Sequence, residues 1–324
     1  MKKFFRPLKI GSLQLKSNIF YAPLAGCSDL PYRQMAQRYR PGIFFNEMVK
    51  MEALVRFDPG TYRLLDYEGD MHPIGAQLCG ANPKIAAQAA RQVEELGFDL
   101  LDLNCGCPVD KVTKDGSGSA LLKNPEKMGE ILFEMVNAVQ IPVTVKIRMG
   151  WDDNHIIAPE ITKIAEQAGA KMITIHGRTR EQGYKGFADW SPIAESKKVA
   201  KEILVVGNGD IFDGKSALAI FEQTDCDGIL ISRGTLGAPW IFQDVVETLE
   251  GNPPPPKTKE QIKETLLEHL EKILAYQPTR RALLDLRRIS SWYLKKSEGS
   301  KVLREKLSRI ASLEEAREII NIYG

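Results

Sequence analysis

Two cysteines, Cys105 and Cys107, lie one residue apart in the segment LDLNCGCPVDKV, residues 101–112. Such a pair could be half of a metal site, a redox pair, a structural feature of the turn or the place of a catalytic thiol. The four histidines are scattered and supply no second pair of ligands, so we expect no metal. Five cysteines without a secretory signal indicate reduced thiols, and the one-residue loop disfavours a disulfide between these two.

Polar and ionisable side chains follow most of the apolar segments of the chain, at the point where each segment ends. One such residue alone is usually a local hydrogen-bonding group or a solvated charge, but the repetition favours a common site. These residues are Gln77, Asn104, Cys107, Lys146, Arg148, His176, Arg178, Asn208, Asp210 and Arg233.

The apolar segments themselves predict the elements that position these residues. Eight β-branched, apolar segments read as strands: 18–26, 42–48, 73–80, 98–108, 142–151, 171–178, 203–210 and 228–234. Helical patterns occupy 83–97, 125–139 and 158–170 between them. Eight such alternations predict a (β/α)8 TIM barrel, whose chemistry gathers at the carboxyl ends of the strands. A doubly wound sheet is the alternative, disfavoured by the number of units and by the lack of an early GxGxxG.

Two late segments, VVGNGD and ISRGTLG, end the seventh and eighth strands in glycine-rich turns. Backbone N–H groups in such turns bind phosphate, and Arg233 adds a positive charge. Lys146 and His176 come from the preceding strands and could reach the rest of a phosphorylated cofactor on the same rim.

The chain changes character at NPPPPKTKE, residues 252–260, because four consecutive prolines form a stiff spacer. We therefore expect a barrel domain over 1–251 and a small all-helical C-terminal domain over 252–324. The net charge of the chain is only +2, no apolar stretch reaches the length of a membrane span, and no signal peptide follows the basic N-terminus. These features favour a cytoplasmic protein.

Positive charge is concentrated near the C-terminus. Residues 280–309 carry ten Lys or Arg and three acidic residues, a net charge of +7. At helical spacing, Leu283, Leu286, Ser290, Tyr293 and Leu294 share one face. Arg281, Arg288, Trp292 and Lys295 share the opposite face. A solvated helix face is the ordinary interpretation, but the charge excess and the tryptophan favour RNA contact.

Several motifs together resemble the tRNA-dihydrouridine synthases, and details such as DGSGSALLKNP are closest to the bacterial B-type branch. The likeness covers nearly the whole barrel. The motifs are APLAGCSDLPYR (22–33), NCGCPVDKV (104–112), VKIRMGW (145–151), ITIHGRTREQGYKGFADW (173–190), GNGD (207–210) and SRGTLGAPWIF (232–242).

The resemblance implies an FMN enzyme that takes reducing equivalents from NADPH or NADH and reduces a uridine of tRNA to 5,6-dihydrouridine. Hydride would go from the reduced flavin to C6, and Cys107 would give the proton to C5. A thiol with an ordinary pKa of roughly 8.5 is mostly protonated near neutral pH, as a general acid must be. The uridine would have to flip out of its stack.

The resemblance also assigns residues. The cofactor would be held by Pro23, Leu24, Ala25, Gln77, Lys146, His176, Asn208, Gly209, Asp210, Ser232, Arg233 and Gly234. The substrate would meet Asn104 and Arg178. The resemblance also implies a helical domain that binds tRNA, which agrees with the RNA contact expected from the helix face of Arg281, Arg288, Trp292 and Lys295. We expect no DNA partner, no membrane contact and a monomer.

The chain departs from the family pattern at Leu24, Cys27, Cys105, Ser232 and Ile289. None of these departures removes a predicted catalytic group, and Cys105 is expected to be only an apolar neighbour of Cys107. Two other functions stay open: another flavin barrel acting on a small molecule, and an RNA-binding protein on a barrel without activity.

Overall fold

The computed structural model describes residues 4–295 and 300–322. Eight parallel strands form a closed barrel, because β11 pairs with β3 and β4 pairs with both β3 and β6. The eight strands are β3 (Ile19–Tyr21), β4 (Phe44–Phe45), β6 (Ile74–Cys79), β7 (Leu100–Cys105), β8 (Val143–Gly150), β9 (Met172–Thr179), β10 (Leu204–Asn208) and β11 (Gly228–Ile231). The predicted TIM barrel is confirmed, and each strand lies within a predicted segment or overlaps it closely.

Three short strands lie outside this ring. β5 (Val49–Lys50) pairs with the end of β6. β1 (Leu8–Ile10) and β2 (Leu13–Leu15) form an antiparallel hairpin, and its apolar residues pack with the residues that fill the barrel interior. The hairpin therefore covers one end of the barrel.

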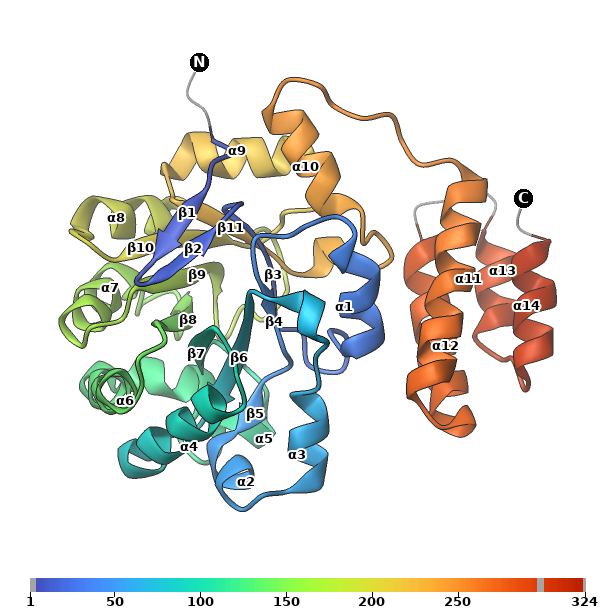
Figure 1. Cartoon of the computed structure of the whole chain (residues 1–324). Helices are drawn as coiled ribbons and strands as arrows, with labels where there is room; N and C mark the ends of the chain where they lie inside the picture. The colour runs from blue at the N-terminus through green and yellow to red at the C-terminus, as the bar shows by residue number, and fades with distance from the viewer. Residues whose placement is uncertain (1–3, 296–299, 323–324) are drawn as a thin grey trace.

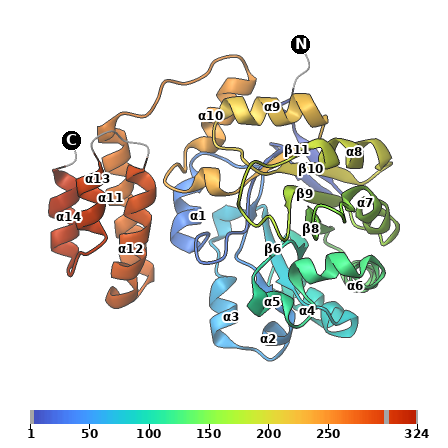
Figure 2. The same ribbon diagram turned by 180° about the vertical axis from the view of Figure 1, so that it is seen from behind.

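Helices surround the barrel, as Figures 1 and 2 show from opposite sides. They are α1 (Leu30–Gln37), α2 (Met51–Val55), α3 (Pro59–Leu64), α4 (Pro83–Glu95), α5 (Asp110–Thr113), α6 (Pro125–Ala138), α7 (Ala158–Gln167), α8 (Ser191–Val199), α9 (Gly214–Thr224) and α10 (Ile241–Leu249). Asn82 and Asn124 cap the N-termini of α4 and α6, each followed by a proline at the first helical position. The helices predicted at 83–97, 125–139 and 158–170 are confirmed, with slightly earlier ends.

The barrel interior changes from apolar to polar along its axis. On β7, Leu100, Asp102 and Asn104 alternate with outward residues that pack under the helices, and Cys105 is one of these. Leu100 belongs to an apolar cluster with Phe20, Phe45, Met172, Val206 and Leu230. Asp102 lies one layer above this cluster and Asn104 another layer above, at the carboxyl ends of the strands.

After residue 251 the chain passes through the proline segment to four helices: α11 (Lys259–Tyr276), α12 (Thr279–Leu294), α13 (Lys301–Leu307) and α14 (Leu313–Asn321). They share an apolar cluster that also includes Trp240 at the start of α10, and they lie beside α1 in both views of the ribbon. Gly237 touches the backbone of α12, since a Cβ there would lie 2.3 Å from the Trp292 carbonyl carbon. The bundle is thus packed directly against the barrel.

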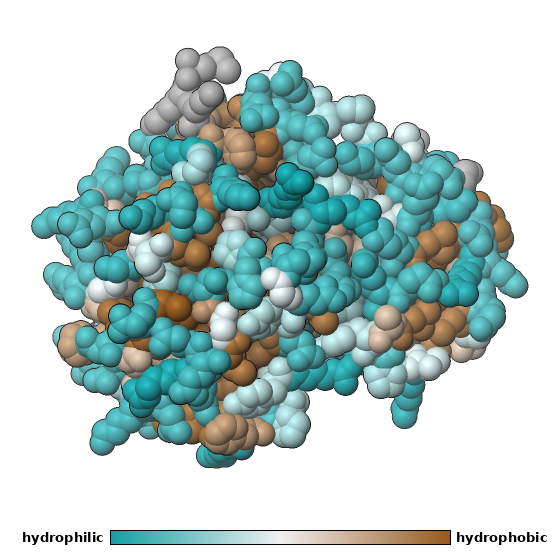
Figure 3. Space-filling view, viewed as in Figure 1, coloured by the Kyte–Doolittle hydropathy of each residue, from teal (hydrophilic) through white to brown (hydrophobic). Residues whose placement is uncertain are grey.

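The face of the molecule in Figure 3 is mostly hydrophilic, and its apolar patches are interrupted by polar side chains. Over residues 4–295 and 300–322, no helix is long and apolar enough to cross a bilayer. In the same residues, no group of three His, Cys, Asp or Glu side chains is arranged to hold a metal ion.

Candidate active site

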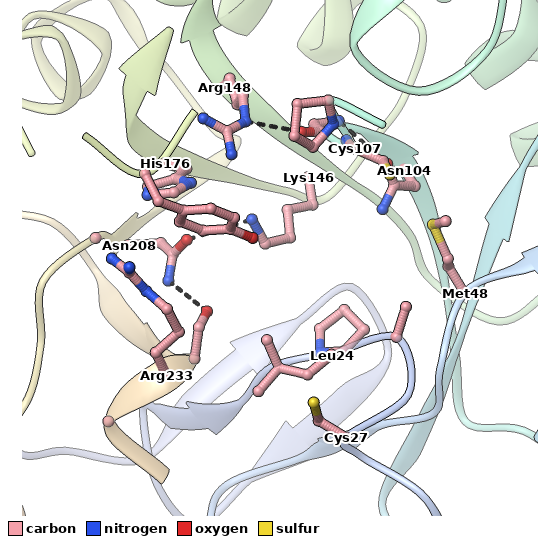
Figure 4. A pocket seen from close by; sticks show the side chains of 18 of the residues that line it. Leu24, Cys27, Met48, Asn104, Cys107, Lys146, Arg148, His176, Asn208 and Arg233 are labelled. Carbon is pink, nitrogen blue, oxygen red and sulfur yellow. Dashed lines mark hydrogen bonds between the residues drawn. The ribbon is translucent and has the colours of Figure 1, made fainter. Parts of the chain in front are cut away.

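A cavity of about 390 Å³ opens at the carboxyl ends of the barrel strands (Figure 4). Every residue predicted to hold the cofactor lines it: Pro23, Leu24, Ala25, Gln77, Lys146, His176, Asn208, Gly209, Asp210, Ser232, Arg233 and Gly234. Asn104 and Cys107 line the same cavity. Residues from loops more than 200 positions apart therefore meet in one place, as the barrel topology requires.

The turn that carries Cys107 is fixed on both sides. The Asn104 Oδ1 accepts hydrogen bonds from the backbone N–H of Gly106 at 3.2 Å and of Cys107 at 2.9 Å. Arg148 donates from Nε to the Gly106 carbonyl at 2.9 Å, and the Ser119 N–H donates to the Cys107 carbonyl at 3.1 Å. The Cys107 thiol is half-buried and faces the cavity, and it makes no hydrogen bond within the described residues.

The neighbouring Cys105 is fully buried on the outward face of β7 and packs among apolar residues. Burial, followed by the nearby Cys79 and Asp102, raises the pKa of its thiol well above the ordinary value. The side chain is therefore an inert apolar filler, and it lies on the side of the strand away from the cavity.

Lys146 extends from β8 into the cavity and donates from Nζ to the Asn208 Oδ1 at 3.3 Å. Burial and the nearby Arg148 lower its pKa to about 8, although Asp102 and Cys107 act in the opposite direction. The ammonium is thus still mostly protonated at pH 7. Asn208 is oriented in turn by donating to the Leu230 carbonyl and to the Ser232 hydroxyl.

His176 extends from β9 beside Lys146 (Figure 4). Burial and four surrounding cations, Lys146 foremost, lower its pKa well below the ordinary value. Its imidazole is therefore neutral at physiological pH. The Arg178 Nη1 lies 3.4 Å from the His176 Nε2, and since guanidinium groups only donate, Nε2 is the acceptor and Nδ1 carries the proton.

Arg178 does not line the cavity, although the resemblance assigned it to the substrate. Its side chain is only 2% exposed and donates to the Asp210 carboxylate at 2.6 Å and to the Gly186 carbonyl at 2.8 Å. Burial would raise the pKa of Asp210, but the bonds from Arg178 and from the Ala188 N–H hold it below its ordinary value. The structure places Arg178 as a support behind Asp210 and His176.

Arg233 follows β11 and pairs with the other carboxylate oxygen of Asp210 at 3.1 Å. Gly209 and Gly234 bring the backbone itself to the cavity wall. A Cβ at Gly234 would lie 2.2 Å from the Ile211 carbonyl oxygen, and one at Gly209 would lie 2.8 Å from the Ala188 Cβ. Both turns therefore require glycine, and Arg233 supplies a cation between them.

Several cavity residues received no specific role from the sequence: Met48, Arg148, Tyr184, Ile211, Phe212 and Leu236. Tyr184 is 56% exposed, and the Arg233 and Arg148 guanidiniums lie 4.6 and 5.5 Å from its ring centroid. Its loop is held by the Gln182 amide, which donates to the carbonyls of Lys185 and Phe187. This loop follows β9, but Tyr184 lies five residues beyond the end of the strand, so the strand-end signal did not indicate it, whereas Arg148 carried that signal.

The basic helix of the C-terminal bundle is α12. Leu286, Ser290, Tyr293 and Leu294 are buried in it and Leu283 is half-buried, as the helical pattern predicts. On the other face, Asp285 is buried and accepts from both Arg281 and Arg288 at 3.1 Å.

Trp292 is half-buried at the contact with the barrel, where its ring meets Tyr32 edge-on at 6.3 Å. This position turns the ring toward the barrel, whereas the sequence placed it on a face open to RNA. Lys295 is exposed, and Lys296 and Glu298 of the basic segment lie outside the described residues. Arg288 also comes within 3.4 Å of where a Cβ of Gly26 would be, so α12 touches the loop that forms one cavity wall.

Comparison with solved structures supports the fold. Histamine dehydrogenase from Rhizobium sp. 4-9 is 15% identical, with a TM-score of 0.60 over 84% of this chain and 51% of that chain. Morphinone reductase in complex with tetrahydroNAD is 14% identical, with a TM-score of 0.55 over 81% and 94% of the two chains.

Comparison with sequences shows the family. The dihydrouridine synthase (Dus) model matches residues 20–322. A probable tRNA-dihydrouridine synthase 1 from Synechocystis sp. is 38% identical over 320 residues, 98% of this chain and 89% of that protein. A tRNA-dihydrouridine synthase B from Vibrio cholerae serotype O1 is 34% identical over 317 residues, 98% of each chain. The family model and the two relatives align with almost the whole length of this chain, so the chain belongs to the dihydrouridine synthase family of oxidoreductases.

Proposed function

We propose that this chain is an FMN-dependent, cytoplasmic tRNA-dihydrouridine synthase that uses NADPH or NADH as reductant. The observation that carries the proposal is the convergence of Cys107 and all the expected cofactor residues on one cavity at the end of the barrel. The barrel, residues 1–251, would bind the flavin, and the helical part, residues 252–324, would bind tRNA.

The cavity residues fit a flavin mononucleotide. Apolar side chains such as Leu24, Ile211 and Leu236 offer a surface for a flat ring. Gly209 and Gly234 bring bare backbone to the cavity wall, where a phosphate would bind, and Arg233 would supply its counter-charge. A cavity of about 390 Å³ also lies within the range of small-molecule sites.

When bound, a reduced flavin supplies the hydride that goes to C6 of the uracil ring. Protonation of C5 is left to the chain, and the Cys107 thiol is the cavity-lining acid in the turn that Asn104, Arg148 and Ser119 hold. Lys146, mostly cationic at pH 7, would stabilise negative charge at the edge of the flavin ring. The neutral His176 would offer a hydrogen bond there and no charge.

An RNA substrate is supported by the basic helix α12 and the segment after it. Arg281 and Lys295 are exposed there, and Arg288 links α12 to the cavity wall near Gly26. Cationic side chains at this place would bind phosphates while a flipped uridine enters the cavity. These residues would set the salt dependence of tRNA affinity.

The test compares Cys107→Ala with the matched control Cys105→Ala in full-length protein. Cys107→Ala is expected to keep the flavin spectrum and to lose dihydrouridine formation in tRNA by about 100-fold or more, because the proton donor is gone. Cys105→Ala should keep both, since Cys105 only fills space under the helices. A wild-type protein that is colourless and cannot be reconstituted with FMN would refute the proposal, as would equal loss in the two variants.

A further inference from the structure

A buried carboxylate lies beneath the cavity, in the middle layer of the barrel interior. Asp102 on β7 is 2% exposed, and it is not among the residues that line the cavity. A charge in such a place is costly unless it is hydrogen-bonded. Among the described residues, two side chains bind Asp102: the Gln77 Nε2 donates to its Oδ2 at 2.7 Å and the Thr144 Oγ1 donates to its Oδ1 at 2.6 Å.

The bond to Gln77 begins a chain of hydrogen bonds that ends at Cys107. The Gln77 Oε1 accepts from the Asn104 Nδ2 at 2.8 Å. The Asn104 Oδ1 then accepts from the backbone N–H groups of Gly106 and Cys107. Two side-chain amides thus connect the buried carboxylate to the turn that carries the thiol.

The two ends of this chain impose the same orientation on both amides. A carboxylate only accepts, so Gln77 must turn its NH₂ group toward Asp102 and its oxygen toward Asn104. Backbone N–H groups only donate, so Asn104 must turn its oxygen toward Cys107 and its NH₂ group toward Gln77. Rotating either amide by 180° would set donor against donor or oxygen against carboxylate. One arrangement remains.

The fixed orientation decides what the cavity offers a ligand. Each amide nitrogen carries two hydrogens, and within the described part of the chain Gln77 and Asn104 each donate only one hydrogen bond from nitrogen. Both residues line the cavity, and Figure 4 shows Asn104 beside Cys107. Their remaining hydrogens suit ring carbonyl oxygens, which uracil and flavin both carry.

We propose that Asp102 is a positioning residue, which fixes the Gln77 and Asn104 amides and, through them, the turn that holds Cys107. The part of this inference that concerns turnover rests on the proposed function. The part that concerns the Cys107 turn does not, because the hydrogen-bond chain belongs to the protein alone.

The test uses full-length Asp102→Asn, which keeps the size of the side chain but can offer Gln77 either an oxygen or an NH₂ group. Thr162→Val is the matched control, since Thr162 is buried in α7 outside the barrel and its hydroxyl donates to the Ala158 carbonyl of the same helix. The first measurement is the alkylation rate of Cys107 by iodoacetamide in flavin-free protein, mapped by mass spectrometry, with the half-buried Cys27 as internal reference. The second is kcat and KM for dihydrouridine formation in tRNA.

In Asp102→Asn, alkylation of Cys107 relative to Cys27 should rise about threefold or more, because the turn is no longer held in one arrangement. The value of kcat should fall about tenfold or more with KM for tRNA nearly unchanged, and Thr162→Val should match the wild type. Unchanged alkylation overturns the proposal whatever happens to kcat, and so does a general loss of folding or a parallel change at Cys27. If alkylation changes but the wild-type protein makes no dihydrouridine, the proposed function fails and the positioning role stands.

Discussion

Replacing Asp102 by asparagine should stabilise the folded protein relative to the wild type, and this relative gain should grow as the pH rises. Burial raises the pKa of Asp102 to about 6, and the hydrogen bonds from Thr144 and Gln77 and the charge of Lys146 offset only part of that effect. The ordinary value is 3.8. Because the folded state binds the proton more tightly than the unfolded state, the wild-type protein loses stability as the pH rises between these two values. A shift of this size corresponds to about 3 kcal/mol once both states are ionised.

Equilibrium urea unfolding of the wild type and of Asp102→Asn at about pH 5 and about pH 7.5 measures the effect. Between these pH values the free energy of unfolding of the variant should gain about 1.4 kcal/mol on that of the wild type. Asparagine also makes different hydrogen bonds, but these change the free energy of unfolding by the same amount at both pH values. The change with pH in the difference between variant and wild type therefore reports the charge of Asp102 alone. Glu134→Gln removes an exposed carboxylate on α6 and is unfolded in parallel as a control for the loss of a surface charge.

The reasoning fails if the difference between Asp102→Asn and the wild type is the same at both pH values, because Asp102 would then titrate as an ordinary aspartate. It also fails if the free energy of unfolding of the variant falls relative to that of the wild type as the pH rises, because the ionised carboxylate would then stabilise the fold. The expected result would mean that a costly charge is retained although a neutral residue of the same shape fits. Such a trade of stability against function is common at active sites.

Three further outcomes follow from the geometry of the site and of the helical bundle. Gly234→Ala should weaken flavin binding about tenfold or more in a fluorescence titration, because the new Cβ would meet a backbone carbonyl, whereas Gly69→Ala, with open space around it, should not. Lys295→Glu should weaken tRNA binding in filter assays and reduce the slope of log affinity against log salt by about 1 or more, while an unchanged slope would exclude this lysine from the RNA contact. Gly237→Ala should lower the melting temperature, because its φ of +69° and its contact with the backbone of α12 leave no room for a side chain, and an unchanged value would mean that the bundle adapts freely.

The barrel could be predicted from the sequence because its signals are local. A buried parallel strand is an apolar segment, and a covering helix has its own period and cap, as at Asn82 and Pro83 for α4. The rim residues followed from the same signals, since the end of each strand fixes where the next side chains lie. For that reason Gln77, Lys146, His176 and Asn208 reached one cavity without any knowledge of their contacts.

The contacts themselves could not be predicted, because a strand end gives the position of a side chain but not its partner. Arg178 lies near the end of β9 like any rim residue, yet the loop over residues 180–188 folds back and covers it, so that it donates to Gly186 and Asp210. Trp292 has the spacing of an exposed residue on α12, but Tyr32, 260 positions earlier, packs against it. Both depend on segments that are distant in the sequence.

The role of Asp102, in the barrel interior, also could not be predicted from the sequence. In the sequence LLDLNC this residue alternates with leucines, so its inward position is evident. An isolated carboxylate among apolar residues nevertheless indicates no function by itself. Its meaning depends on Gln77, which the barrel brings from β6 to the correct height beside it. The register Gln77↔Asp102 sets the carboxylate one layer below Asn104, so a single amide spans the gap between them. A shift of that register by one residue would turn Gln77 out of the barrel and disconnect Cys107 from its support, so the pairing of β6 with β7 is itself part of the active site.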